Sequence, residues 1–446
     1  MYIKNQKFLV LGASKSGLAV INYIVEDGGT CKVYEQLKTP KAFSAIERLN
    51  EMGVQVLNSE EVEEYVKEID VLVLSPGVPI NHEIAIKAKQ FGKRIIGELE
   101  FAYAINIPLI VAVTGTNGKT TTVTLLDYIF ERAGKERRLV GNVGVPMTSK
   151  VKNSDKNTVF ITEVSSFQLE SVNAFTPHIS CILNIAPDHL ERHYTMDNYI
   201  FLKKRIFKNQ RESEYTVLNF DDQIVKNFYL EVRAKVVWVS TKEKIDGAYC
   251  LDGKVFWFDQ FIINANEIKI KGEHNLYNAL FAVALAKLMG VETAFIVNAL
   301  QTFNGVKHRI EFVCEKNGVE YYNDSKATNT ASTISAISSL EKSAVLILGG
   351  SEKGEDYGEL FEKIKQSPIR HIVLTGASAF NMLDSAGKHG VSNLSVVKGF
   401  NSAVKTASLF AQKGDCVLLS PACASFDEFN GFEERGDAFV KAVESL

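Results

Sequence analysis

The segment Val111–Thr124, VAVTGTNGKTTTVT, constrains the fold of this chain more than any other stretch. The short apolar run Ile107–Val113 leads into it, and apolar residues recur at helical spacing at Val123, Leu126 and Ile129. This pattern predicts a strand, a loop containing glycine and a helix, in that order. Such a loop directs backbone N–H groups and the positive end of the helix toward an anion.

Two side chains of the loop suit a nucleoside triphosphate. Lys119 adds a point charge for phosphate, and Thr120 adds a hydroxyl for a phosphate-bound Mg²⁺. The spacing departs from the common GxxxxGK[ST] pattern, because two residues separate Gly115 from Gly118 and Val113 stands where the first glycine would fall. The alternative is an ordinary turn between a strand and a helix. Gly-Lys-Thr-Thr at such a junction favours phosphate binding.

Length and composition exclude several classes of protein. At 446 residues the chain is long enough for roughly two to four domains. A hydrophobic fraction of 46% and a formal net charge of -3 provide no basic field, so we expect no nucleic-acid partner. The six cysteines lack CxxC spacing, and no run approaches the roughly 20 apolar residues of a membrane span. We therefore expect a cytoplasmic monomer with no membrane partner.

Polar loops follow the strands expected near the N-terminus. Residues 12–17, GASKSG, resemble a nucleotide-binding first turn in which Ser14 replaces the second glycine. Glu35 closes the next strand, where a ribose-binding carboxylate is expected. Ser75–Pro79 forms a tight turn after the strand at 70–74, and ligands sit at that edge of an open α/β sheet. Each of these patterns also fits a plain turn, so the region alone leaves its ligand open.

Polar residues also end the strands that follow the phosphate loop. Residues 158–163, TVFITE, end in Glu163, where a carboxylate is placed to hold Mg²⁺ beside phosphate. Residues 179–184 run into Asp188 and His189. A single strand-end Glu is commonly just solvated, and a lone His is commonly structural. Their recurrence at several strand ends favours a site.

Two helical segments carry further candidates. Residues 198–209 predict a helix with apolar side chains on one side, and Lys203 would ordinarily belong to its solvated basic face. Residues 272–279, GEHNLYNA, open an apolar helix that reaches Met289. The His and Asn residues at its start either cap the helix or contact the edge of a base.

Strand and helix patterns alternate through most of the chain, except at 247–264, where short antiparallel strands are expected. The last region begins with Arg309 beside two strand-like runs and continues through Asp324–Asn329 into further strand–helix units. We therefore expect three α/β domains. Their expected bounds are 1–104, 105–304 and 305–446.

Together these motifs resemble those of one family, the ATP-dependent Mur ligases. The shared motifs are the short loop TGTNGKT, a strand-end Glu, an HNxxN element and an Arg–Asp pair that opens the third domain. Within the family, EVSSFQLE, DSKATN and LSPACASFDEF, at 163–170, 324–329 and 419–429, are similar to segments of the members that add D-glutamate. The motifs occur in the same order from Gly12 to near the C-terminus.

The resemblance implies a Rossmann-like N-terminal domain for a UDP substrate, a central P-loop ATPase-like domain with a parallel sheet, and a C-terminal Rossmann-like domain for an amino acid. It implies ATP-dependent joining of D-glutamate to UDP-N-acetylmuramoyl-L-alanine (UDP-MurNAc-L-Ala) through an acyl phosphate, in peptidoglycan precursor synthesis. The implied cofactors are ATP and Mg²⁺, with Mg²⁺ at two sites, and Lys203 would be carbamylated. Cations suit this chemistry because a carboxylate attacking a phosphate crowds negative charge.

The resemblance also implies roles for individual residues. The catalytic residues would be Lys119, Glu163, His189 and Lys203. The Mg²⁺ ligands would be Thr120, Glu163, His189 and Lys203. The ATP contacts would be Gly115, Thr116, Asn117, Gly118, Lys119, Thr120, Thr121, Asn275, Asn278, Arg309 and Asp324. The contacts with the UDP substrate would be Ser14, Lys15, Glu35, Ser75, Gly77, Asn142 and His189. The D-glutamate contacts would be Lys326, Thr328, Lys353, Ser425 and Phe432.

Three alternatives stay open at this point. A dinucleotide-dependent oxidoreductase would use Gly12–Gly17 and Glu35, but it gives the phosphate loop and Lys203 no role. A nucleotide-switched binding module would keep the phosphate loop and would need no amino-acid pocket. Another Mur ligase would add a different amino acid.

Overall fold

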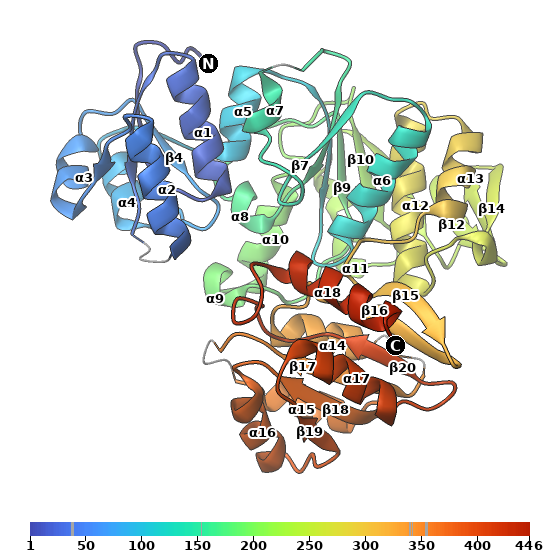
Figure 1. The fold of residues 1–446 in the computed structure, drawn as a ribbon. Coiled ribbons are helices and arrows are strands. Elements are labelled where there is room, and N and C mark those ends of the chain that lie inside the picture. The colour runs from blue at the N-terminus through green and yellow to red at the C-terminus, as the bar shows by residue number, and fades with distance from the viewer. Residues whose placement is uncertain (37–39, 153, 339, 341, 353–355) are drawn as a thin grey trace. The chain divides into compact units, whose positions relative to one another are not determined.

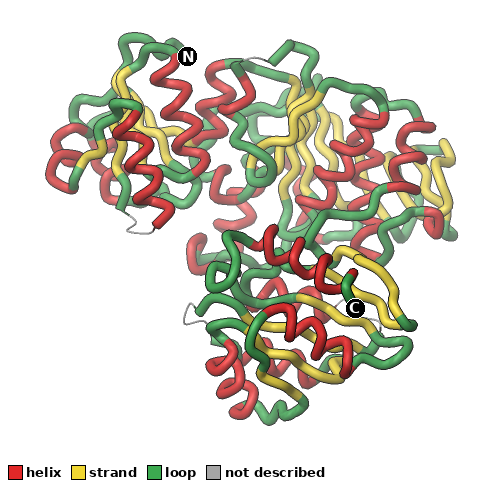
Figure 2. The backbone as a smooth tube through the Cα atoms, in the orientation of Figure 1, coloured by secondary structure: helices red, strands yellow, loops and turns green. Residues whose placement is uncertain are grey.

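The computed structural model describes residues 1–36, 40–152, 154–338, 340, 342–352 and 356–446. The chain divides into two compact units, Met1–Phe303 and Asn304–Leu446. The described residues form three sheets, two in the first unit and one in the second (Figures 1 and 2). Parallel pairing dominates each sheet, which confirms the α/β fold class. The boundary expected at residue 104 stays a prediction.

The first sheet is parallel, with the strand order β3-β2-β1-β4-β5. Its side chains alternate between two apolar cores: Phe8 and Val10 pack with helices α1 and α2, whereas Leu9 and Leu11 pack with α3 and α4. The order reverses between β1 and β4, which is where open α/β sheets bind ligands. The strands are β1 (Lys7–Leu11), β2 (Thr30–Tyr34), β3 (Val56–Leu57), β4 (Val71–Leu74) and β5 (Arg94–Gly97). The helices are α1 (Lys15–Glu26), α2 (Pro40–Glu51), α3 (Ser59–Tyr65), α4 (Glu83–Gln90) and α5 (Glu98–Ile105).

The second sheet has the order β14-β13-β12-β11-β10-β9-β6-β8-β7. The pairs β12–β13 and β13–β14 are antiparallel, which confirms the expectation for 247–264, and the other pairs are parallel. The strands are β6 (Leu109–Thr114), β7 (Arg137–Gly141), β8 (Val159–Glu163), β9 (Ile179–Ile182), β10 (Tyr215–Asn219), β11 (Lys235–Ser240), β12 (Gly247–Leu251), β13 (Lys254–Trp257) and β14 (Gln260–Asn264).

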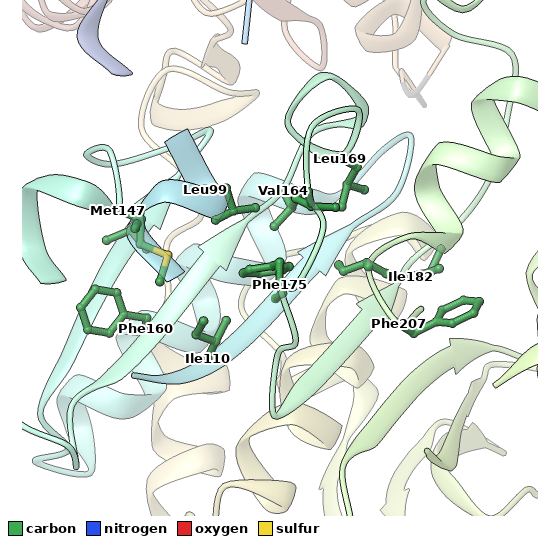
Figure 3. Close-up of a cluster of buried hydrophobic side chains, with 14 of the residues drawn as sticks. Leu99, Ile110, Met147, Phe160, Val164, Leu169, Phe175, Ile182 and Phe207 are labelled. Atoms are coloured by element: carbon green, nitrogen blue, oxygen red, sulfur yellow. The ribbon is translucent and has the colours of Figure 1, made fainter. Parts of the chain in front are cut away.

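An apolar core lies against one face of this second sheet (Figure 3). Ile110 of β6 and Phe160 of β8 contribute to it together with Phe175 and, from α5, Leu99. Phe101 of the same helix belongs to a core of the first sheet, so α5 packs into the cores of both sheets. The helices that follow are α6 (Lys119–Arg132), α7 (Thr148–Val151), α8 (Ser166–Leu169), α9 (Leu190–His193), α10 (Met196–Lys204), α11 (Gln223–Asn227), α12 (Glu273–Leu288) and α13 (Thr293–Thr302), with 3₁₀ turns η1 (Phe228–Glu231) and η2 (Ala265–Glu267).

The helix expected at 198–209 ends earlier than its apolar pattern indicated. Helix α10 stops at Lys204, and the chain continues in turns whose N–H groups bond to carbonyls three residues back, as Ile206 N–H does with Lys203 O at 3.2 Å. These tighter turns place both Ile206 and Phe207 in the buried core. The prediction of a helix is therefore wrong for residues 205–209. Ile206 and Phe207 are buried, as their apolar pattern indicated, but they lie in turns and not in a helix.

The third sheet has the order β15-β16-β20-β17-β18-β19, in which the hairpin β15–β16 is antiparallel and the remaining pairs are parallel. Apolar cores cover both of its faces. Its strands are β15 (Glu311–Lys316), β16 (Val319–Asn323), β17 (Ala344–Gly349), β18 (Ile369–Thr375), β19 (Leu394–Val396) and β20 (Cys416–Leu419). Its helices are α14 (Thr330–Ser338), α15 (Gly358–Lys365), α16 (Ala379–Lys388), α17 (Phe400–Phe410) and α18 (Phe432–Glu444). Over the described ranges, no helix combines the length and apolar character needed to cross a bilayer.

Candidate active site

The phosphate loop lies between two other polar strand ends of the second sheet. Strand β6 is hydrogen-bonded to β8 on one side and to β9 on the other. The loop after β6 is therefore flanked by Glu163, the last residue of β8, and by the segment 183–189 that follows β9. The parallel topology gathers these sequence-predicted residues at one carboxyl edge.

Glycine is required at two positions of the loop. Gly115 has φ +150° and Gly118 has φ +83°, backbone conformations that residues other than glycine rarely adopt. A Cβ on Gly115 would lie 3.0 Å from the Leu183 Cβ, and one on Gly118 would lie 2.3 Å from the Asn278 Oδ1. The loop is thus packed against the segment after β9 and against α12, which explains both glycines of the pattern.

Lys119 folds back over this loop from the first turn of α6. Its Nζ donates to the carbonyl oxygens of Gly115 at 2.9 Å and Thr116 at 2.7 Å. The Thr116 N–H donates to Asn184 O at 3.0 Å, and the Asn117 N–H donates to the Asn184 side chain at 2.8 Å. The loop is therefore braced from the neighbouring strand end while the ammonium group stays on its surface. Thr120 and Thr121 follow in the same helical turn and are buried.

Glu163 presents an uncompensated carboxylate oxygen beside the loop. Its side chain is 2% exposed, and its Oε1 accepts a hydrogen bond from the Asn142 Nδ2 at 2.7 Å. Its Oε2 has no hydrogen-bond partner among the described residues. A buried carboxylate oxygen without a donor is costly, and a divalent cation is a partner that such an oxygen suits. Asn142, expected at the substrate, thus also orients the expected metal ligand.

Lys203 lies against the same loop from α10. It is 2% exposed, and its Nζ donates to Gly115 O at 2.7 Å and to the Thr114 Oγ1 at 3.3 Å. Burial, with the nearby charge of Lys119 as the next cause, holds the pKa of Lys203 well below its usual range. The site therefore makes the ammonium form of this lysine less favourable than it is in water.

His189 comes from the segment after β9 and directly precedes α9. Its backbone has φ 54°, which is uncommon for a residue with a side chain. Its Nε2 lies 3.4 Å from the Asp188 Oδ2, and its ring centroid lies 4.8 Å from that of Phe167. Among the residues that the structure describes, no cluster of three or more His, Cys, Asp or Glu side chains forms a ready-made metal site.

The HNxxN element connects α12 to the phosphate-loop helix. The Oδ1 of Asn278 accepts a hydrogen bond from the Thr122 Oγ1 at 3.3 Å, and its Nδ2 donates to the Asn275 Oδ1 at 3.2 Å. Asn275 in turn donates to Lys271 O at 2.8 Å. The structure thus places Asn278 against the phosphate-loop helix and Asn275 beside Asn278.

The loops after β1, β2 and β4 meet at one edge of the first sheet. The Ser75 Oγ donates to Gly12 O at 2.8 Å, and Glu35 accepts the Ala13 N–H at 2.7 Å. Gly12 has φ +89°, and a Cβ there would lie 3.0 Å from the Ser75 Cβ. Of the residues expected to contact the UDP substrate, this edge carries Ser14, Lys15, Glu35, Ser75 and Gly77. Asn142 and His189 belong to the second sheet instead.

Asp324 is a buried carboxyl group in the second unit, directly after β16. Its Oδ2 accepts a hydrogen bond from the Ser420 Oγ at 2.7 Å, and its Oδ1 accepts the Ile310 N–H at 3.3 Å. Burial raises its pKa to about 7, although the bond from Ser420 and the charge of Arg309 act in the opposite direction. Arg309 itself is exposed. The expected ATP contacts thus fall in both units, with these two in 304–446.

Ser425 and Arg435 are buried beside the carboxyl ends of β16, β17 and β20. Ser425 is 1% exposed, and its Oγ has no partner within the described part of the chain. Arg435 donates to Ser325 O at 2.9 Å and to Cys423 O at 3.0 Å. Burial lowers the pKa of Arg435 to about 10. Arg435 therefore ties the DSKATN segment to the LSPACASFDEF segment. Sequence reasoning missed Arg435. The one indication was its spacing of four residues from the apolar Phe439, which places both side chains on the same face of α18.

The remaining expected D-glutamate contacts lie around this arginine, with one exception. The Ser325 Oγ donates to Phe432 O at 2.8 Å, and the Lys326 N–H donates to His308 O at 2.9 Å. The Thr328 N–H donates to Lys326 O at 2.9 Å. Lys353 lies outside the described residues.

The chain is similar to known proteins along its whole length. Residues 6–97 match the family described as Mur ligase MurD-like, N-terminal domain, residues 113–286 the Mur ligase middle domain, and residues 308–423 the Mur ligase, glutamate ligase domain. The chain is 43% identical over 449 residues to the UDP-N-acetylmuramoylalanine--D-glutamate ligase of Caldanaerobacter subterraneus subsp. tengcongensis, with 100% of both chains covered. It is 40% identical over 452 residues to the enzyme of the same name from Clostridioides difficile, again with 100% of both covered.

Solved structures share the fold at low sequence identity. The UDP-N-acetylmuramate-alanine ligase of Thermotoga maritima superposes with a TM-score of 0.59 at 17% identity, covering 99% of this chain and 100% of that one. The MurF ligase of Thermotoga maritima, solved in complex with ADP, gives a TM-score of 0.55 at 15% identity over 99% and 96% of the two chains. Both similarities extend over nearly the full length.

Proposed function

The chain belongs to the Mur ligase family, and from this premise we propose that it joins D-glutamate to UDP-MurNAc-L-Ala in an ATP-dependent reaction of peptidoglycan precursor synthesis. The observation that carries the proposal is the 43% identity over the full length to a relative named for that reaction. The substrates are small molecules, and we propose that the protein acts as a cytoplasmic monomer. The three proposed domains are 1–104 for the UDP substrate, 105–304 for ATP and 305–446 for the amino acid.

In the proposed mechanism, the phosphate loop holds the triphosphate of ATP. The N–H groups of the loop and of the first turn of α6 donate to phosphate oxygens, and Lys119 moves its ammonium from the carbonyls of Gly115 and Thr116 to the β- and γ-phosphates. We assign Asn275 and Asn278 to the base, and Arg309 and Asp324 to the nucleotide as well. Lys119 and the loop would offset the negative charge that builds up when the alanyl carboxylate attacks the γ-phosphate.

The residues beside the loop fit Mg²⁺. The Glu163 Oε2 is buried without a partner among the described residues, and the Thr120 hydroxyl lies one residue after Lys119. Mg²⁺ bound by these two groups supplies positive charge that offsets the negative charge of the transferring phosphoryl group. We assign a second Mg²⁺ to His189 and to a modified Lys203.

Carbamylation of Lys203 agrees with its environment. An amine attacks CO₂ through its free electron pair, forms an N–C bond and releases a proton, so the neutral form is the one that reacts. Burial holds the pKa of Lys203 well below its usual range and therefore makes that form easier to reach. The product carries a negative charge, which would place an anion suited to a metal ion next to Lys119.

The amino-acid pocket is assigned to the third domain. Lys326, Thr328 and Ser425 offer a cation and two hydroxyls for the carboxylates and amine of D-glutamate, Phe432 supplies an apolar wall, and Lys353 completes the proposed set. The D-glutamate amine attacks the acyl phosphate, and phosphate leaves from the tetrahedral intermediate. Asn142 and the residues Ser14, Lys15, Glu35, Ser75 and Gly77 hold the UDP-linked acceptor.

Phosphate release tests the proposal directly. The full chain is incubated with ATP, Mg²⁺ and UDP-MurNAc-L-Ala, and each amino acid is added in turn, including L-glutamate as the stereochemical control. We expect release to depend on D-glutamate, with a product of matching mass, and to be abolished in Glu163→Gln. Maximal release with another amino acid would favour a different Mur ligase activity. Release that is indifferent to every amino acid would favour a nucleotide-switched binding module.

A further inference from the structure

One arginine of α9 contacts three successive carbonyls of the turn after β4. The Nη1 of Arg192 donates to Gly77 O at 3.1 Å. Its Nη2 donates to Val78 O at 3.3 Å and to Pro76 O at 3.4 Å. Arg192 stands three residues after His189, in the segment that follows β9. A single side chain thus joins the turn of the first sheet to the His189 segment of the second.

Glu170 fixes the orientation of this arginine from the other side. The Arg192 Nε lies 2.9 Å from the Glu170 Oε1, and the Nη2 lies 2.7 Å from the Oε2. The side chains of Arg192 and Glu170 are 16% and 9% exposed, so water screens this pair little. The guanidinium also lies 4.7 Å from the Phe167 ring centroid. This bidentate pair fixes the orientation of the guanidinium as well as its distance from Glu170, whereas a lysine at position 192 would fix only the distance.

The carbonyl contacts determine where the amide of Gly77 points. The peptide unit is planar and trans, so the Gly77 N–H lies on the side opposite to the Pro76 carbonyl. Since that carbonyl faces Arg192, the Gly77 N–H is directed away from the guanidinium. The next amide, Val78 N–H, is already bonded to Ser75 O at 2.9 Å. Arg192 therefore holds one donor of the turn in a fixed direction.

Open space lies beside the Cα of Gly77. A Cβ placed on Gly77 would meet no atom within 4 Å, and the backbone of Gly77 is not in the left-handed region. Neither packing within the described residues nor backbone conformation therefore requires glycine here. The turn follows β4, next to β1, where the strand order of the sheet reverses and ligands bind. A ligand that approaches the backbone closely accounts for the glycine.

We propose that Arg192 is a positioning residue that orients the Gly77 peptide toward the UDP-linked substrate, and that Glu170 in turn orients Arg192. This inference rests on the proposed function, from which it takes the identity of the substrate. Arg192 touches no reacting atom. Because Arg192 lies three residues after His189, it also connects the turn after β4 to the His189 segment. The substrate-binding turn of the first sheet is thereby held beside the proposed reaction site of the second sheet.

The test compares binding and kinetics in matched variants of the full chain. Calorimetry measures the Kd for UDP-MurNAc-L-Ala, and steady-state kinetics measure kcat and the KM for each of the three substrates. In Arg192→Lys and Glu170→Gln we expect the Kd and KM for UDP-MurNAc-L-Ala to rise by about tenfold or more, with the KM for ATP and for D-glutamate within about twofold. The Tm should stay close to that of the unmodified chain.

Lys152→Ala is the matched control. Lys152, which directly follows α7, pairs with Glu26, the last residue of α1, at 3.2 Å. This pair also joins elements of the two sheets, but neither residue belongs to the turn after β4. We expect no change in the Kd of this variant. An unchanged Kd in Arg192→Lys and in Arg192→Ala would overturn the inference, and so would equal losses for all three substrates or equal losses in Lys152→Ala. If the unmodified chain bound UDP-MurNAc-L-Ala yet released phosphate with no amino acid, the proposed function would fail, while the Kd comparison would still decide the role of Arg192.

Discussion

Replacing Asp324 by Asn should stabilise the unit 304–446, and more at high pH than at low pH. Asp324 is buried, and burial raises its pKa from 3.8 to about 7. Its two oxygens accept bonds from the Ser420 Oγ and the Ile310 N–H. Asn has the same shape and keeps an acceptor for Ile310, and its amide can donate to the Ser420 hydroxyl, which is also bonded to Thr333. The substitution therefore removes the charge with little change in packing.

The sign follows from the two pKa values. The carboxyl group binds its proton more tightly in the native state than in the unfolded state. The free energy of unfolding therefore falls as pH rises from the unfolded pKa to the native pKa, and the fall is complete above about pH 7. At about 1.4 kcal/mol for each pH unit between the two values, the full loss is about 4 kcal/mol. Between about pH 5 and about pH 8 the loss amounts to about 3 kcal/mol.

The assay has to follow the second unit by itself. Both tryptophans, Trp238 and Trp257, lie in the first unit, so intrinsic tryptophan fluorescence does not follow this one. Amide hydrogen exchange of the buried strands β16, β17 and β20 in a urea series, corrected for the intrinsic exchange rate at each pH, gives the free energy of unfolding. We expect Asp324→Asn to gain about 3 kcal/mol more over the unmodified chain at about pH 8 than at about pH 5. Its phosphate release should fall, because the charge serves the proposed nucleotide site.

A control of opposite sign lies in the same unit. Burial alone would raise the pKa of Asp415, but the bond from Arg370 at 2.8 Å and the Gln412 N–H lower it overall. Asp415→Asn should therefore destabilise the unit at neutral pH and not stabilise it. A difference between Asp324→Asn and the unmodified chain that is the same at both pH values would refute the reasoning, since it would mean that Asp324 is ionised throughout that range.

Three further substitutions test the proposed site. Lys119→Ala should lower phosphate release by about a thousandfold or more at unchanged Tm, because it removes a charge from the transferring phosphoryl group, and turnover within a fewfold of normal would contradict the phosphate-loop assignment. Lys203→Ala should lose activity and regain part of it with a short-chain carboxylic acid, which replaces the proposed carbamate; absence of rescue, together with a plain ammonium in well-resolved density, would contradict carbamylation. Ser425→Ala should raise the KM for D-glutamate by about tenfold, with the Tm nearly unchanged because the Oγ has no partner among the described residues, and an unaltered KM would remove Ser425 from the pocket.

The phosphate loop was predictable because its constraints are local. Gly115 and Gly118 adopt positive φ within four residues, and Lys119 bonds to carbonyls three and four residues before it. The sheet topology followed from alternation of strands and helices, which brings strand ends such as Glu163 to one edge without any knowledge of contacts. What the sequence did not reveal was the state of Glu163, whose second oxygen lacks a donor only because of how the surrounding chain packs.

Lys203 shows where a sequence pattern was misjudged. Together with its basic neighbours it suggested a solvated face, yet it follows Tyr199 by four residues and so shares the side on which the apolar residues lie. Its 2% exposure agrees with that spacing. Arg192 and Arg435 are different, because each has partners more than a hundred residues away, Gly77 for Arg192 and Ser325 for Arg435. No local periodicity carries such contacts.

The phosphate-loop edge holds two lysines, Lys119 and Lys203, and one buried carboxylate, Glu163. Lys119 and Lys203 both donate to the Gly115 carbonyl, so one oxygen accepts from two amines. Burial lowers the pKa of Lys203, and the nearby charge of Lys119 lowers it further. A triphosphate would draw the Lys119 ammonium away from the Gly115 carbonyl. Its positive charge would then lie farther from Lys203, which would remove one of the causes that lower the pKa of Lys203. A carbamate formed on Lys203 before nucleotide binds would avoid this conflict, since the anion would attract both Lys119 and a metal ion. On the proposed mechanism we therefore expect modification of Lys203 to precede nucleotide binding.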